Sequence, residues 1–216
     1  MKLKNILSEL KVVKSLNEIG EGVTPFPFQH VGSVNVGTWE RIMSEYKSDG
    51  SSFNEEELPA IEYTFKSDKT TYKTKIYGQF SRHRFINFQG KRDPDPRKYN
   101  VVITVAFDDT SNPQLGEPGS EKITNYGEQF KVMSTVTKIS IEVAKEIMEI
   151  DGVKLTAIHI GPKFESDEKG KPAAQTKRGR LYLEYIKKQS VNLPGTWTSV
   201  ILDDRFVLYN QTSKNN

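Results

Sequence analysis

The stretch FKVMSTVTKISIEVAKEIMEI, residues 130–150, decides the fold, because it has the clearest periodicity in the chain. Its apolar residues recur at steps of four, three, four, four and three, which places them on one stripe of a helix. They are Val132, Val136, Ile139, Val143, Ile147 and Ile150. Charged residues such as Lys138 and Glu142 fill the other face. The pattern therefore predicts a long amphipathic helix that packs on another layer of structure.

The sequence around this helix predicts the other layer. Gly152 ends the helix, and VKLTAIHI at 153–160 is typical of a buried strand. A second helix is expected at 177–189, after a long polar loop. Alternating or apolar runs predict further strands, at 60–65, 72–76, 85–88, 99–107, 123–126, 197–202 and 205–209. We expect an α+β fold with a mostly antiparallel twisted sheet, on which the long amphipathic helix and the C-terminal helix pack.

The N-terminal part differs in composition from the rest. An apolar stripe predicts a helix near the start of the chain, formed by Leu3, Ile6, Leu7, Leu10, Val13 and Leu16. This helix either docks on its own domain or forms a detached arm. Prolines and aromatic residues then indicate an extended segment over 23–39. We divide the chain into an N-terminal helix and arm, 1–57, and an α+β core, 58–216, within a single domain.

Composition restricts the chemistry. The 216 residues are 35% hydrophobic and 27% charged, with a net charge of +3, which suits one core with a polar surface. The absence of cysteine excludes disulfides, thiolate metal sites and a cysteine nucleophile. No apolar run approaches the roughly 20 residues that span a bilayer, and charges at Glu9, Lys11 and Lys14 interrupt any signal-peptide core. We expect no membrane association.

Complete catalytic motifs are missing from the sequence. The three histidines are far apart and lack metal-binding spacing, and no Walker loop, GxGxxG or GxSxG motif occurs. His159 lies in a predicted strand, where a structural role is the usual one. Asp108 and Asp109 end the most apolar strand, but an Asp pair at a strand end is also ordinary turn chemistry. We therefore expect no cofactor and no metal site.

Two basic clusters are the best candidates for binding. The sites proposed for an anion or nucleic acid are Arg82, Arg84, Lys91 and Arg92 in the first cluster, and Lys163, Lys171, Lys177, Arg178 and Arg180 in the second. Phe85 and Phe88 lie within the first cluster, and such aromatics suit base stacking. Arg178 and Arg180 open a predicted helix, whose free amides also attract anions. The alternative is that these side chains only solvate loops.

The order of several segments resembles an uncharacterised protein family of tailed bacteriophages. The segments are NEIGEG at 17–22, PFPF at 25–28, EYTFKSDKTTYKTKIY at 62–77, VVITVAF at 101–107, GEQFKVMSTVTKISIEVAKEI at 127–147 and RGRLYLEYIKK at 178–188. The resemblance covers about residues 16–209. It implies a bacteriophage origin, partners among virion proteins or nucleic acid, and a location in the virion or the host cytoplasm.

The chain is also similar, more weakly, to the acyl-CoA-dependent N-acyltransferase fold, in which a helix, a strand and a helix bearing Leu-Tyr follow one another. This similarity implies a general acid at Tyr182. The family's glycine-rich pyrophosphate loop, however, is replaced here by GEQFKV at 127–132. A splayed gap between the strands that flank the long helix would favour the enzyme, and a continuous sheet would favour a binding protein.

We therefore expect a non-enzymatic bacteriophage protein, either a virion component or a binding module for nucleic acid or a protein. The alternative is a degenerate or atypical acyl-CoA-dependent N-acyltransferase-like enzyme.

Overall fold

The structure, a computed structural model, describes residues 23–49, 56–81, 99–110, 128–161, 177–202 and 205–211. The strands within these ranges are β1 (Phe28–Val31), β2 (Glu56–Lys66), β3 (Thr71–Ser81), β4 (Tyr99–Asp109), β5 (Val153–Gly161), β6 (Trp197–Leu202) and β7 (Arg205–Asn210). The helices are α2 (Val36–Asp49), α3 (Gln129–Glu149) and α4 (Lys177–Gln189), and a 3-10 turn, η2 (Ser190–Asn192), follows α4. The predicted α+β class is confirmed. The helix expected at 3–16 and the strands expected at 85–88 and 123–126 lie outside the described residues.

The described strands form one seven-stranded sheet in the order β1-β2-β3-β4-β5-β7-β6. All neighbours are antiparallel except β4 and β5, which flank α3 in the sequence and run parallel. Their pairing runs from Tyr99 opposite Val153 to Ala106 opposite Gly161, with one irregularity after Val101. The sheet is therefore mostly antiparallel, as predicted, and it is continuous across the β4–β5 pair over the whole length of β5.

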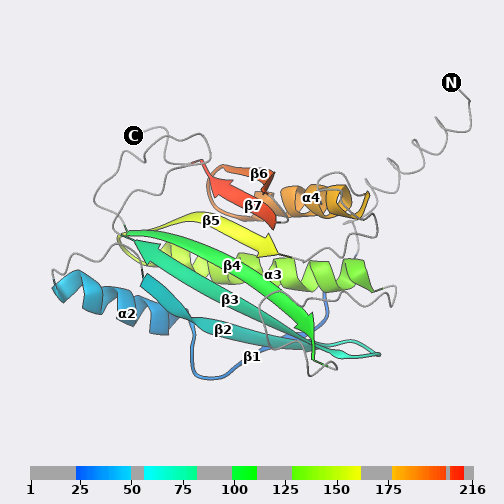
Figure 1. Cartoon of the computed structure of the whole chain (residues 1–216), viewed down its shortest axis with the longest axis horizontal. Coiled ribbons are helices and arrows are strands. Elements are labelled where there is room, and N and C mark those ends of the chain that lie inside the picture. Colours follow the sequence, from blue (N-terminus) through cyan, green and yellow to red (C-terminus); the bar gives the residue numbers. More distant parts are fainter. Residues whose placement is uncertain are drawn as a thin grey trace, which may run out of the picture.

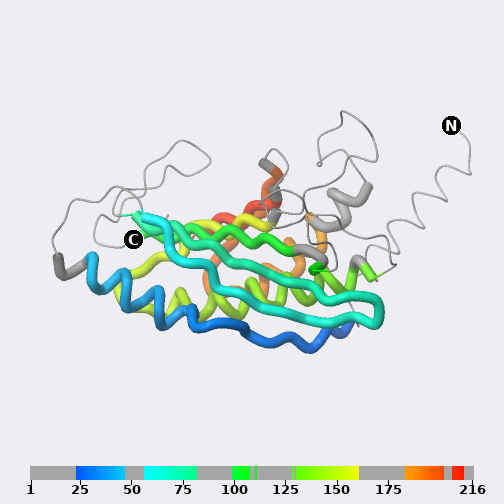
Figure 2. Tube along the Cα trace, turned by 60° about the horizontal axis from the view of Figure 1, so that its bottom comes forward, coloured from blue at the N-terminus to red at the C-terminus, as the bar shows by residue number. Residues whose placement is uncertain are grey.

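The three described helices cover one face of this sheet. Figure 1 shows α3 behind β4 and β5, with α2 and α4 at opposite ends of the layer. In the turned view of Figure 2, α2 and α3 lie together below the strands. Contacts of α3 with both α2 and α4 agree with this single layer. We call this the covered face and the other the open face.

Strand alternation assigns residues to the two faces. In β3, Tyr72, Ile76 and Phe80 are buried beneath the helices, while Lys73 and Lys75 between them point to the open face. The apolar stripe of α3 is buried against the covered face, and its charged residues from Lys138 to Glu149 are exposed. Gly152, at φ 68°, then lets the chain turn from α3 into β5.

Helix α2 was not predicted, because most of its residues are polar. It docks through Trp39, which is fully buried and donates its indole N–H to the Pro59 carbonyl oxygen at 2.7 Å. Gly78 of β3 makes room for this side chain, since a Cβ there would lie 2.7 Å from the Trp39 ring. The large side chain of Trp39 in the helix layer thus fits where Gly78 of the sheet has no side chain.

The segment before β1 is fixed along α3. The Phe26 amide donates to Thr135 Oγ1 at 2.9 Å, and Ser134 Oγ donates to the Val23 carbonyl oxygen at 3.3 Å. The Phe26 ring stacks on Phe65 of β2. Residues 23–49 consequently share one hydrophobic core with the strands that follow.

Candidate functional site

A groove of about 340 Å³ lies on the outer side of α3, away from the sheet. Its walls come from three elements: the segment before β1, α3, and the end of α4 with the turn that follows. Val23, Pro25 and Ile141 give it an apolar part. We call this cavity the α3 groove. Its volume falls in the lower part of the range for small-ligand sites.

The polar side chains at its base join these three elements. Tyr185 of α4 hydrogen-bonds to Ser134 of α3, whose hydroxyl also donates to the Val23 carbonyl oxygen. Burial raises the pKa of the Tyr185 hydroxyl, and the contact with Ser134 opposes that rise. Both side chains are almost fully buried, Tyr185 at 7% exposed and Ser134 at 4%. The base is therefore neutral and held in position.

The rim of the groove is charged and more exposed to solvent than the base. Lys138 and Lys145 are seven residues apart on α3 and share a face of the helix, with Glu142 between them. Two lysines and one glutamate give this rim a formal charge of +1. Lys138 Nζ lies 3.9 Å from Glu142 Oε1, and both side chains are about half exposed. Such a pair is weak, so either lysine can turn toward an anionic group.

At the mouth formed by α4, the groove has amide groups. Asn192 Nδ2 donates to Gln189 Oε1 at 3.0 Å, which leaves further donor and acceptor positions on both side chains. An apolar wall, two cations and two amides can bind a ligand that has an apolar body and one acidic group. Within the ranges that the structure describes, no group of three or more His, Cys, Asp or Glu residues could hold a metal ion.

The strands β3 and β5 lead toward the two predicted basic clusters from opposite ends of β4. Arg82, Arg84, Lys91, Arg92, Lys163 and Lys171 lie outside the described residues, and Lys177, Arg178 and Arg180 belong to the first turn of α4. The first cluster follows β3, which ends at Ser81, opposite Asn100 at the start of β4. The second follows Gly161, opposite Ala106 near the other end of β4. The two attachment points are roughly 20 Å apart along the strand.

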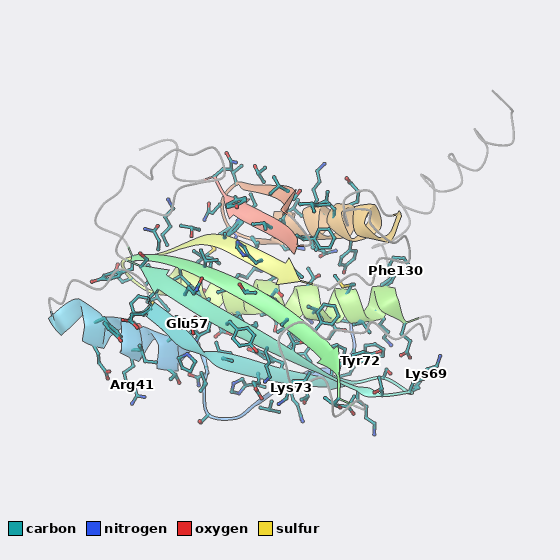
Figure 3. The ribbon with its side chains drawn as sticks, viewed as in Figure 1. Arg41, Glu57, Lys69, Tyr72, Lys73 and Phe130 are labelled. Atoms are coloured by element: carbon teal, nitrogen blue, oxygen red, sulfur yellow. The ribbon has the colours of Figure 1, made fainter. Side chains whose placement is uncertain are left out.

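The residues of the alternative enzyme can be placed only in part. Tyr182 lies in α4, and its side chain is outside the described atoms. Glu128 occupies the N-cap of α3, where an acyl-CoA pyrophosphate would have to bind, and its buried Oε2 atom has no hydrogen-bond partner in the described structure. Figure 3 labels Phe130 just after it, in the first turn. A carboxylate at this position repels an incoming pyrophosphate.

The groove residues were missed at the sequence level. Ser134 belongs to a run of hydroxyl residues, STVTKIS, inside the most apolar helix of the chain. Four of these hydroxyl residues, Ser134, Thr135, Thr137 and Ser140, are buried. A helix face that carries only charged residues is expected to face solvent. Hydroxyl residues in place of charged ones beside an apolar stripe indicate instead that another segment packs on the outer side of the helix. This run of hydroxyl residues inside an apolar helix was the feature of the sequence that could have predicted the groove.

Comparison with known proteins gives no assignment. No protein-family model matches the chain, and no curated protein and no solved structure is significantly similar to it. In the described part of the chain, no helix is long and apolar enough to cross a membrane.

Proposed function

We propose that this protein is a non-enzymatic binding module of a bacteriophage, and that it binds a protein partner in the α3 groove. The observation that carries the proposal is the groove itself. It combines a fixed neutral base, made by Tyr185 and Ser134, with a rim of exposed lysines on α3. The bacteriophage part of the proposal is supported by the resemblance of residues 16–209 to a phage protein family.

The chemistry of the groove favours an extended segment that carries an acidic side chain. Pro25 and Ile141 can contact an apolar side chain, while Lys138 and Lys145 can pair with a carboxylate. The amides of Gln189 and Asn192 can bond to a peptide backbone. A flexible segment of a virion or host protein fits this description.

Three observations weigh against catalysis. The β4–β5 pair is continuous, so the sheet lacks the splayed gap that would favour an acyltransferase. Glu128 at the start of α3 is unfavourable for the pyrophosphate of acyl-CoA. The described part of the groove contains hydroxyl groups but no histidine or cysteine that could activate one as a nucleophile.

Nucleic acid is supported less well than a protein partner. The basic clusters are attached at opposite ends of β4 and β5, and on the open face Glu62 forms ion pairs with Lys73 and Lys75. A salt-dependent titration with single- and double-stranded nucleic acid tests this alternative. Tight binding with a steep salt dependence, reduced by Arg178→Ala/Arg180→Ala, would replace the protein partner with nucleic acid.

A photo-cross-linking amino acid at position 145 tests the proposal directly in phage-producing cells. The matched control carries the same group at Arg41, which lies on α2, away from the groove (Figure 3). We expect one discrete adduct from position 145 that is absent from position 41 and is reduced by Lys138→Glu. Equal labelling from both positions, or no adduct from position 145, would contradict the proposal. If the partner is a virion protein, purified virions contain both proteins at fixed stoichiometry.

The second candidate is a degenerate or atypical acyl-CoA-dependent enzyme. The observation in its favour is the order α3–β5–α4 on a mostly antiparallel sheet. It predicts that acyl-CoA raises the thermal unfolding midpoint, because a ligand that binds only the folded state stabilises it by mass action. It also predicts loss of activity in Tyr182→Phe. An unchanged midpoint at millimolar acyl-CoA would eliminate it.

A further inference from the structure

The sheet ends at β6, an edge strand with an unusual composition. Its sequence, WTSVIL, contains no charged residue and no proline, and its pairing with β7 is regular from Trp197 to Leu202. Within the described ranges, β6 is hydrogen-bonded to β7 alone. Edge strands of stable monomers are usually protected by charge, proline, a bulge or short length. None of these protects β6, which has the typical length of a strand.

The opposite edge of the sheet shows such protection. β1 has only four residues and is followed by Gly32 at φ 86°. The His30 ring contacts Tyr63, and its Nε2 atom is hydrogen-bonded to the Val34 carbonyl oxygen. This hydrogen bond holds the chain in a turn directly after β1. Among the described residues, therefore, one edge of the sheet is a short strand, and the other is a longer strand with no partner on its outer side.

The side chains around β6 also suit contact with another molecule. The residues from Trp197 to Ile201 are all partly exposed, and Val191, in the turn before β6, is 81% exposed. Val191 is the one large hydrophobic residue that is exposed among those described. The neighbouring α4 exposes Glu184 and Lys187, which have opposite charges.

From these observations we infer that β6 pairs with β6 of a second copy of this chain, giving a symmetric dimer with one sheet continuous through both subunits. Two identical antiparallel strands around a two-fold axis are self-complementary. Because β6 is uncharged, no like charges oppose each other at the axis.

Sedimentation velocity on the full chain, over about 1 to 100 µM, tests the inference. We expect a reversible monomer–dimer equilibrium, because pairing of short edges buries little area and gives weak association. Val200→Lys should raise the dissociation constant by about tenfold or more, since two like charges then meet near the axis. Gln79→Lys is the matched control, because it adds the same charge to the internal strand β3 and should leave the constant unchanged.

A second variant and a second measurement protect the test against misfolding. Thr198→Lys, on the same strand, should act like Val200→Lys, and thermal unfolding will show which variants are folded. In the wild type, hydrogen exchange of the amides of residues 197–202 should slow as concentration rises. A wild-type chain that stays monomeric over the whole range would overturn the inference. So would a dimer that neither lysine on β6 weakens and whose β6 amides exchange independently of concentration.

Discussion

On the covered face of the sheet, Ile76, Ile103 and Ile158 are at most 1% exposed, whereas on the open face Lys75, Thr104 and their neighbours remain in contact with solvent. Both sets of side chains belong to the same strands and alternate along them. The side chains of the covered face pack against three helices at the density of a protein interior, so their size and shape are restricted. The open face has no described helix to fit, so substitutions there should cost little.

The largest effect is expected from Trp39→Ala, which removes the side chain that joins α2 to the covered face. The ring is fully buried, and its N–H satisfies the Pro59 carbonyl oxygen. Truncation of a buried aromatic residue typically costs about 3–5 kcal/mol. Denaturant unfolding of the variant measures this loss. A loss below about 1 kcal/mol would show that α2 contributes little to the core.

Gly78→Ala should be the next most destabilising substitution, by about 1–3 kcal/mol. The new Cβ would lie 2.7 Å from Trp39 and 2.9 Å from Leu58. Gly37→Ala in α2 is the control, because its Cβ would meet only the Asn35 side chain, at 3.3 Å. Partial recovery of stability in Gly78→Ala combined with Trp39→Phe would identify the clash as the cause; equal losses in both glycine variants would contradict it.

A buried hydroxyl on the covered face allows a stabilising substitution. Thr74 is fully buried, and its Oγ1 atom has no hydrogen-bond partner in the described structure. Thr74→Val should raise the free energy of unfolding by roughly 1 kcal/mol, because it removes an unsatisfied polar group without changing shape. Thr104→Val, on the open face, should change it by less than about 0.5 kcal/mol. Equal changes in the free energy of unfolding for the two variants would contradict the proposed difference between the faces.

Tyr63, at the margin of the covered face, should make stability fall in alkaline solution. Burial, together with the charges of Glu146 and Glu142, raises the pKa of its hydroxyl to about 12. Between pH 10 and 12 the unfolded chain loses this proton while the folded chain keeps it, so the free energy of unfolding decreases as the pH rises. Because the group is half exposed, we expect about 1 kcal/mol after allowing for solvent screening. Tyr63→Phe should remove this part of the pH dependence, and the difference between the two unfolding curves measures it.

The smallest effect is expected on the open face, from Glu62→Gln. The hydrogen bond from Lys73 is the main reason that the pKa of the Glu62 carboxyl is lowered, and Lys75 adds to it. The contribution to stability is therefore present above the pKa of the unfolded chain and is lost as the pH falls through the folded value. All three side chains are about one-third exposed, so the loss should be about 0.5 kcal/mol and should shrink in salt. A larger loss of stability that does not depend on salt would mean that substitutions on the open face cost as much as those on the covered face.

The same contrast explains which parts of the fold were predictable. Alternation in β3 and β4, and the stripe of α3, depend on local periodicity, and the sequence contains that information directly. The docking of helix α2 includes the pairing of Trp39 with Gly78, which are 39 positions apart in the sequence. No local pattern reveals such a match.

The candidate site was less predictable than the fold. The α3 groove joins Val23, Ser134 and Tyr185, which come from three distant segments. Each is unremarkable in its own segment, and only the tertiary arrangement makes them neighbours. The basic residues, by contrast, form conspicuous runs in the sequence, and the strands that lead into the two runs place their attachment points at opposite ends of β4 and β5.

The attachment of the N-terminal segment to α3 has a consequence for the order of folding. The bonds from Phe26 to Thr135 and from Ser134 to Val23 span 109 and 111 positions. During synthesis, the first strand of the sheet emerges from the ribosome long before the helix that holds the preceding segment. The β2–β3 hairpin can form from neighbouring residues, but this segment must wait for α3, and such distant contacts slow folding. Until the ribosome has completed α3, the aromatic side chains near residue 26 lack their final partners, and this interval is when a nascent chain would most need protection by a chaperone.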